Sequence, residues 1–161
     1  MEKPRLASWA ALAGFIAMCL GIGALGGWIT ADSVKTWYPT LNKPSWNPPD
    51  WVFAPVWTTL YVMMAVAAWL VWKKDVRFSG VRAALILFFV QLALNLMWSA
   101  LFFGARSPGL ALMEIAVLWL AVAASLYAFI SLSRPAGLLL IPYLAWVSFA
   151  AVLNFSIWRL N

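Results

Sequence analysis

The stretch WYPTLNKPSWNPPDWVFAPVWTTLY, residues 37–61, joins a loop rich in proline and tryptophan to the start of a long apolar segment. The loop is expected to be stiff, because each of its prolines fixes one backbone φ angle and removes one backbone donor. Trp37, Trp46 and Trp51 have large amphipathic rings, which suit the headgroup level of a membrane or the rim of a pocket. We predict that this loop is a lid over a cavity inside a membrane. An ordinary belt of interfacial tryptophans is the alternative.

The composition excludes a soluble domain, since 65% of the 161 residues are hydrophobic, only 10% are charged and the mean hydropathy is +0.89. Five apolar stretches each reach the roughly 20 residues that a helix needs to cross a bilayer. They lie near residues 8–29, 51–72, 81–103, 110–132 and 137–158. Because these runs are continuously apolar rather than alternating, a β-barrel is not expected. The sequence predicts an all-α fold, an integral membrane bundle of five transmembrane helices, in one domain over 1–161 with a loop at 30–50.

The basic residues predict how the bundle is oriented. Seven are expected on the N-terminal side (Lys3, Arg5, Lys73, Lys74, Arg77, Arg82, Arg134) and four on the other (Lys35, Lys43, Arg106, Arg159). This bias favours an N-terminus inside the cell, with the Pro/Trp loop facing outward from a bacterial cell membrane. The net charge of +6 suits anionic headgroups. No nucleic acid partner is expected, because no basic cluster lies on a large soluble surface.

The chain has no histidine, and its one cysteine, Cys19, lies inside the first apolar run. The most common general base and metal ligand is therefore missing, and neither an intrachain disulfide nor a thiolate cluster is possible. We expect no catalytic acid–base residues, no metal site and no cofactor. Cys19 is interpreted as a small packing residue.

Three of the predicted helices carry aromatic rings and isolated amide or hydroxyl groups on one face. The stripes are Trp57, Tyr61 and Met64; Gln91, Asn95, Trp98 and Phe102; and Tyr143, Trp146, Ala150, Leu153 and Asn154. Rings stack on a flat apolar ligand and single polar groups orient it, so the stripes predict a ligand pocket in which Ala150 leaves room. The alternative is that Asn and Gln serve only as hydrogen bonds between helices.

Two further features lie inside the apolar runs. Glu114 is an acidic residue within the fourth run, and its carboxylate is expected to pair with Arg106 across the preceding turn; a proton or cation path is the alternative. Gly23 and Gly27 form a G-x-x-x-G pattern in the first run, which indicates close helix packing.

Three segments together resemble the TspO/MBR family of tryptophan-rich sensory proteins, which includes the mitochondrial translocator protein or peripheral-type benzodiazepine receptor. They are the stretch at 37–61, QLALNLMWSALFFGAR at 91–106 and PYLAWVSFAAVLNFSIWRLN at 142–161. The resemblance implies a five-helix bundle, usually a homodimer, that binds porphyrins such as protoporphyrin IX. In the mitochondrial members it also implies binding of cholesterol and of synthetic benzodiazepine or isoquinoline carboxamide ligands.

The resemblance also implies which residues line the ligand site. They are Trp57, Asn95, Trp98, Trp146, Ala150 and Leu153, to which helical spacing adds Tyr61. The family's sterol motif needs a tyrosine where this chain has Phe155, which argues against high-affinity sterol recognition. The lack of histidine agrees with stacking of a metal-free porphyrin rather than ligation of haem iron.

Two functions remain open. The first is a protein that binds tetrapyrroles for sensing, regulation or transport. The second is an enzyme that degrades porphyrin in light through tryptophans such as Trp57 and Trp146. The lack of an acid–base pair and of a metal site favours the first. In a third reading, a lipid-packing or scaffold protein without a ligand, Gln91 and Asn95 would serve only as interhelical bonds.

Overall fold

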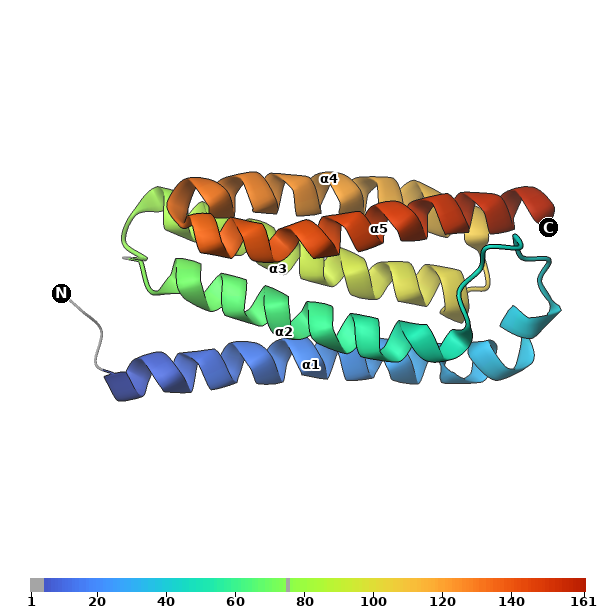
Figure 1. Cartoon of the computed structure of the whole chain (residues 1–161), viewed down its shortest axis with the longest axis horizontal. Helices are drawn as coiled ribbons and strands as arrows, with labels where there is room; N and C mark the ends of the chain where they lie inside the picture. Colours follow the sequence, from blue (N-terminus) through green and yellow to red (C-terminus); the bar gives the residue numbers. More distant parts are fainter. Residues whose placement is uncertain (1–4, 75) are drawn as a thin grey trace.

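The computed structural model describes residues 5–74 and 76–161, and these fold into a bundle of five long helices (Figure 1). The helices are α1 (Arg5–Thr36), α2 (Phe53–Trp72), α3 (Ser79–Ser99), α4 (Pro108–Leu132) and α5 (Arg134–Leu160). All five are long and apolar enough to cross a membrane, and no strand occurs in the described residues. The predicted all-α membrane fold is therefore confirmed. α1 begins and α5 ends at opposite ends of the bundle, as an odd number of spans requires.

α1 is longer than the sequence predicted. It continues to Thr36, past the expected end at residue 29, so the first part of the predicted loop is helical. The apolar run stops earlier, but side-chain hydrogen bonds to backbone carbonyls stabilise the helix beyond it. The Thr36 hydroxyl donates to the Asp32 carbonyl at 2.9 Å, and the Ser33 hydroxyl donates to the Phe103 carbonyl at 2.7 Å. The second bond attaches the extension of α1 to Phe103, in the segment that follows α3.

The remaining loop contains two short 3-10 turns, η1 (Tyr38–Thr40) and η2 (Asp50–Val52), the second of which leads directly into α2. Beside this loop, α3 continues into a π-helical turn (Ala100–Gly104), and the Trp37 and Tyr38 rings pack on it. This wider turn closes with a hydrogen bond from the Ala105 amide to the Ala100 carbonyl at 2.7 Å. Turns of this kind occur frequently at functional sites.

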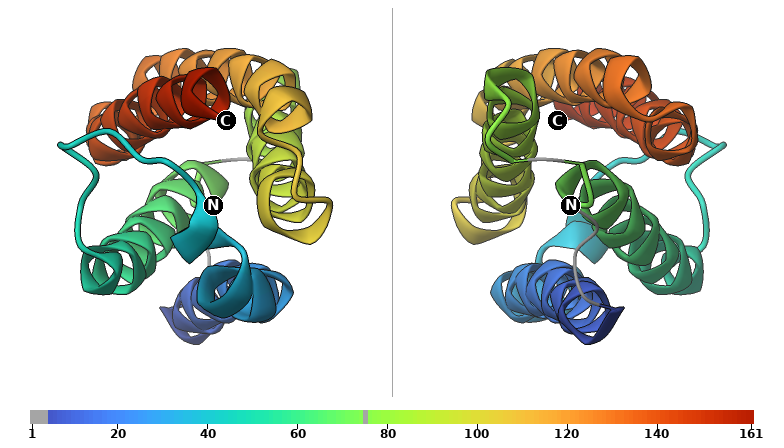
Figure 2. Two further views of the ribbon diagram at one scale, coloured as in Figure 1. Left: turned by 90° about the vertical axis from the view of Figure 1, so that its right-hand side faces the viewer. Right: turned by 90° about the vertical axis from the view of Figure 1, so that its left-hand side faces the viewer.

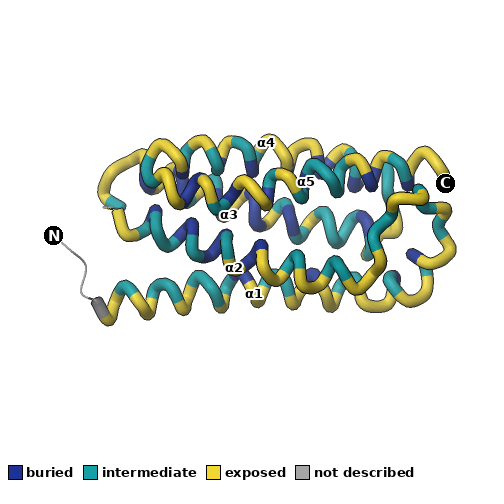
Figure 3. The backbone as a smooth tube through the Cα atoms, viewed as in Figure 1, coloured by how far each residue is buried: buried dark blue, intermediate teal, exposed yellow. Residues whose placement is uncertain are grey.

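Seen along the bundle axis, α1 lies on the side opposite α4 and α5 (Figure 2). α4 packs against α3 and α5, whereas α2 bridges α1 and α5. α1 is the least buried helix, with 11% of its most apolar window buried, and Figure 3 shows few buried positions along it. The bundle is therefore tight on the α3–α4–α5 side and looser beside α1.

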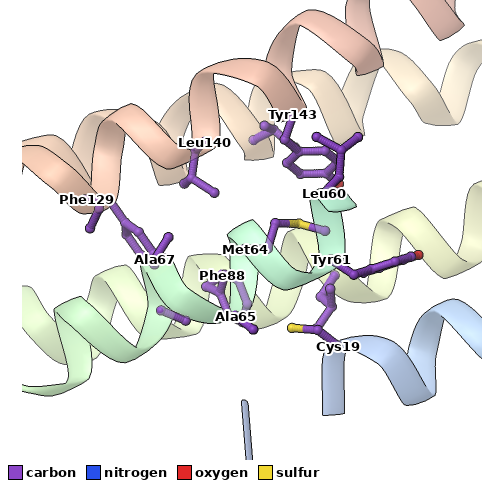
Figure 4. Packing of buried hydrophobic residues seen from close by; sticks show 14 of the residues in the cluster. Cys19, Leu60, Tyr61, Met64, Ala65, Ala67, Phe88, Phe129, Leu140 and Tyr143 are labelled. Atoms are coloured by element: carbon purple, nitrogen blue, oxygen red, sulfur yellow. The ribbon is translucent and has the colours of Figure 1, made fainter. Parts of the chain in front are cut away.

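The larger apolar core takes buried side chains from all five helices, and Figure 4 shows part of it from close by. Met64, Phe88, Phe129 and Tyr143 are fully buried there, and the Phe88 and Phe129 rings stack with centroids 6.0 Å apart. Cys19 is also fully buried and packs in this core. A second, smaller core that includes Tyr38 and Phe102 packs beside the Pro/Trp loop, next to the open space of the bundle.

Candidate ligand cavity

A cavity of about 480 Å³ lies in the half of the bundle beside the loop. Its walls come from α1, α2, α3 with its π-helical turn, α5 and the loop, so segments distant in sequence enclose it. Most of the wall is apolar, and much of it is aromatic. The aromatic lining residues are Tyr38, Phe53, Trp57, Tyr61, Trp98, Phe102, Phe103 and Trp146. Its volume lies within the range of roughly 300–1,000 Å³ that is typical of sites for small organic ligands.

The residues that the sequence predicted to bind ligand meet on this wall. They are Trp57, Tyr61, Asn95, Trp98, Trp146, Ala150 and Leu153. The cavity-lining parts of α2, α3 and α5 lie at the same end of the bundle, so three stripes at helical spacing converge there. The other ends of the stripes, with Met64, Gln91 and Tyr143, lie in the buried layer next to the cavity and not on its wall.

Edge-to-face contacts orient the rings of the wall. The Trp57 and Trp146 ring centroids are 6.4 Å apart at an interplanar angle of 89°, and Phe53 meets Trp146 at 5.9 Å and 70°. Trp98 stacks on Phe102 at 5.3 Å. These geometries are the favoured ones for aromatic pairs. The rings therefore form a mutually supported surface.

A chain of hydrogen bonds joins α2, α3 and α5 beneath this surface. The Tyr61 hydroxyl donates to Asn95 Oδ1 at 2.6 Å, and Asn95 Nδ2 donates to the Tyr143 hydroxyl at 3.1 Å. The Tyr143 hydroxyl in turn donates to Gln91 Oε1 at 2.9 Å. Gln91 therefore serves only to hydrogen-bond one helix to another. Asn95 also joins the helices, but in addition it lines the cavity.

Two tryptophans on the wall differ in how their ring N–H groups are used. Trp98 Nε1 donates to Asn154 Oδ1 at 3.0 Å, and Asn154 Nδ2 donates to the Pro108 carbonyl at 2.8 Å, so this bond ties α3, α5 and α4 together. Trp146 Nε1 is buried and has no acceptor among the described residues. A buried donor without a partner is costly. Because this N–H group is itself buried, it does not face the open space of the cavity.

The three tryptophans predicted to form a lid do not line the cavity. Trp37 packs on Phe102 with centroids 5.8 Å apart, and Trp46 packs on Phe149 at 5.9 Å. Trp51 is 75% exposed. The loop contributes Tyr38 and Asp50 to the wall instead.

Sequence reasoning missed the contribution of Tyr38. Its ring is 6% exposed, and its hydroxyl donates to Asn47 Oδ1 at 2.9 Å, which closes the loop on itself. Lys43 supports the same residue by donating to the Tyr38 carbonyl at 2.8 Å. Asn47, which precedes two prolines, was the available signal for such a closed loop, because Asn side chains bond within turns.

Sequence reasoning also assigned no part of the cavity to α1. The wall includes Gly23, Ala24 and Gly27 of that helix. A Cβ on Gly23 would lie 2.7 Å from the Tyr61 ring, whereas a Cβ on Gly27 would meet nothing within 4 Å. Of the G-x-x-x-G pair, one glycine permits close packing against α2 and the other borders open space.

The predicted pair between Glu114 and Arg106 is wrong. Arg106 Nη2 contacts Asp32 Oδ2 at 3.1 Å, and Arg106 Nε donates to the Ser33 hydroxyl at 3.3 Å. The longer α1 brings both partners to the turn, which spacing along the chain does not reveal. Glu114 is 8% exposed, and neither carboxylate oxygen has a hydrogen-bond partner among the described residues.

Comparison with known proteins gives one consistent result. The model of the TspO/MBR family matches residues 15–159. The "Tryptophan-rich protein TspO" of Chlorobaculum tepidum is 49% identical over 150 residues, which cover 91% of this chain and 92% of that protein. The "Tryptophan-rich sensory protein" of Cereibacter sphaeroides is 42% identical, with 95% and 92% covered. The human "Translocator protein" is 41% identical, with 95% and 91% covered.

Proposed function

Because the chain belongs to the TspO/MBR family, as three of its segments predicted, we propose that it binds porphyrins such as protoporphyrin IX in this cavity, for tetrapyrrole sensing, regulation or transport. The protein is an integral membrane protein, so a flat apolar ligand would reach the site from the lipid as well as from water. The observation that carries the proposal is the convergence of three aromatic stripes on a single wall.

The chemistry of the wall supports a flat ligand. Rings fixed by edge-to-face contacts lose little freedom when a ligand stacks on them, which favours affinity. The Tyr61 hydroxyl already donates a hydrogen bond to Asn95, so these two residues shape the wall and need no hydrogen bond from the ligand.

The alternative function, light-dependent degradation of porphyrin, has support from one observation. Trp57 and Trp146 are neighbours on the wall, with ring centroids 6.4 Å apart, so an excited ligand lying on this part of the wall would meet two oxidisable rings. Indole is a poor catalytic group without light or a radical, so we propose binding without turnover in darkness.

We further propose a homodimer in a bacterial cell membrane with the N-terminus inside, from the family resemblance and the bias of basic residues. Sterol is not proposed as a ligand. Phe155, which replaces the motif tyrosine, is 44% exposed, and the Arg159 guanidinium lies 5.9 Å from its ring centroid. Phe155 is not part of the cavity wall.

The test is a titration of the purified protein with protoporphyrin IX, followed by the porphyrin absorbance in darkness and then under illumination. We expect saturable binding in darkness, which Trp146→Ala weakens about two- to tenfold through loss of one aromatic contact. Trp28→Ala is the matched control, because Trp28 is 77% exposed and outside the cavity wall. Light-dependent loss of absorbance in the parent, absent from Trp146→Ala, would favour the enzyme. Absence of saturable binding would overturn the proposal.

A further inference from the structure

The exposed residues of the cavity wall form two rows. One row lies on α1, and the other begins at η2 and follows α2; the rows are Leu20, Ala24 and Gly27, and Asp50, Ala54 and Thr58. Residues three or four apart share one face of a helix, so each row is continuous along its helix. The described wall residues of α3, the π-helical turn and α5 are all buried or half-buried. The cavity is therefore closed on the α3 and α5 sides and open along a slot between α1 and α2.

The path of α1 explains this slot. Towards the middle of the bundle α1 packs closely on α2, since a Cβ on Gly23 would lie 2.7 Å from the Tyr61 ring. Nearer the loop α1 packs on the π-helical turn, where the Ser33 hydroxyl donates to the Phe103 carbonyl at 2.7 Å. Between these two contacts, a Cβ on Gly27 would meet nothing within 4 Å. The slot lies where α1 passes from one packing partner to the next.

Most of the slot lies at the depth of the lipid. Leu20 and Ala24 are near the middle of the α1 span, Leu6–Thr36. On the other helix, Thr58 lies eight residues past Asp50, or about 12 Å along the helix axis. Asp50 is at the loop-side end of the slot, where α2 begins. The rest of the slot therefore faces the acyl chains of the bilayer.

The rim of the slot is chemically suited to lipid. The Thr58 hydroxyl donates to the Ala54 carbonyl at 2.8 Å, and the Thr30 hydroxyl donates to the Gly27 carbonyl at 3.0 Å. Polar groups in hydrocarbon must be satisfied within the protein, and these two hydroxyls are. The side chains of the rim at this depth are also small, apart from Leu20. A flat apolar molecule would thus meet neither an unpaired polar group nor a bulky ring there.

We propose that the slot between α1 and α2 is a lateral portal, through which the cavity takes flat apolar ligands that are dissolved in the bilayer. This inference rests on the proposed function, since it states from which phase the ligand of the same cavity arrives. The Pro/Trp loop at the end of the bundle is a separate route, which leads to water.

The experiment places a phenyl ring on each side of the slot in protein reconstituted into vesicles. The variants are Ala24→Phe on α1 and Thr58→Phe on α2. Association of protoporphyrin IX is followed in darkness by quenching of tryptophan fluorescence, and release by a chase with excess protein-free vesicles. Because a ligand uses the same route in both directions, we expect association and release both to slow about three- to tenfold in each variant.

The direction of the two changes separates a blocked portal from a disturbed wall. A ring that only disturbed the binding wall would speed release, and a ring that only added a contact to the ligand would slow release without slowing association. Each variant tests the portal by itself, so a variant that fails to fold leaves the other to decide.

Each variant has a matched control. Thr59 is exposed like Thr58, and its hydroxyl likewise donates to a carbonyl of its own helix, that of Pro55 at 2.8 Å, but Thr59 lies outside the cavity wall. Ala17 is exposed, lies two turns before Ala24 on the same face of α1 and is also outside the wall. We expect Thr59→Phe and Ala17→Phe to keep both rates within about twofold of the parent.

Three results would overturn the portal. Parental rates in both slot variants, with porphyrin still bound, would overturn it and leave the proposed function standing. Equal slowing in the control variants would do the same, because added bulk on the lipid-facing surface would then explain the effect. If the parent binds no porphyrin, the proposed function falls and the portal falls with it.

Discussion

Asn161 forms a ring of hydrogen bonds with Asn42, a residue 119 positions earlier in the chain. Asn161 Oδ1 accepts from the Asn42 amide at 3.0 Å, and Asn161 Nδ2 donates to the Asn42 carbonyl at 3.0 Å. One side chain thus satisfies both backbone groups of a loop residue. The contact fastens the middle of the Pro/Trp loop to the end of α5, the helix that supplies Trp146, Ala150 and Leu153 to the cavity wall.

We expect Asn161→Ala to speed release of bound porphyrin while the bundle stays assembled. Two hydrogen bonds of about 1 kcal/mol each would be lost from the loop, so dissociation up to about thirtyfold faster is expected. Stopped-flow release of the fluorescent porphyrin measures it. Asn42→Ala is the control, because it removes only the side-chain bond to the Leu160 carbonyl and keeps both bonds to Asn161. Release from Asn161→Ala at the parental rate would show that the loop does not limit ligand exit.

The two tryptophans with different N–H environments predict different costs for the same substitution. Trp98→Phe removes the donor to Asn154 and leaves its Oδ1 unpaired, which should cost about 1–3 kcal/mol of unfolding free energy. Trp146→Phe removes no hydrogen bond, so it should cost clearly less. Thermal unfolding of the purified variants in one detergent gives the comparison. Equal losses would mean that ring volume, and not the hydrogen bond, determines the stability at these positions.

The sequence predicts the parts of the cavity that a single straight helix determines. Trp57, Asn95 and Trp146 were identified because residues three or four apart on a helix share a face, whatever the helix packs against. Tyr38 and Gly23 were not, because their places on the wall depend on how a loop closes and how α1 lies against α2. Those are tertiary relationships.

The same distinction explains the error at Arg106. Distance along the chain suggested Glu114 as its partner, but the partner comes from α1, 74 residues away. That contact exists only because α1 continues past its apolar run, through residues whose side chains bond to backbone carbonyls. Hydropathy identifies where a helix crosses the lipid and does not show where the helix ends.

Replacing Glu114 with an apolar residue is expected to raise the free energy of unfolding. A buried carboxylate without a partner pays for its lost hydration and recovers nothing from hydrogen bonds, so Glu114→Leu should raise the unfolding free energy by about 1–3 kcal/mol. The thermal midpoint in detergent is the measurement.

Ser125→Ala is a suitable control on the same helix. Ser125 is also buried, but its hydroxyl already donates to the Ala121 carbonyl at 2.8 Å, so little change is expected. A lower midpoint for Glu114→Leu would contradict the prediction and would show that the carboxylate stabilises the folded bundle.

The two glycines of α1 predict opposite outcomes for one added methyl group. In Gly23→Ala the new Cβ would lie 2.7 and 2.8 Å from two carbons of the Tyr61 ring. That ring is not free to move away, because its hydroxyl is held by Asn95 at 2.6 Å. We therefore expect Gly23→Ala to lower the free energy of unfolding by about 1–3 kcal/mol through overpacking, and to weaken porphyrin binding as the ring shifts on the wall.

In Gly27→Ala the methyl meets nothing within 4 Å, so the stability of the helix should be unchanged or raised by up to about 1 kcal/mol. Thermal unfolding and porphyrin titration of both variants measure the difference, and equal behaviour would mean that α1 does not press on Tyr61 in the membrane.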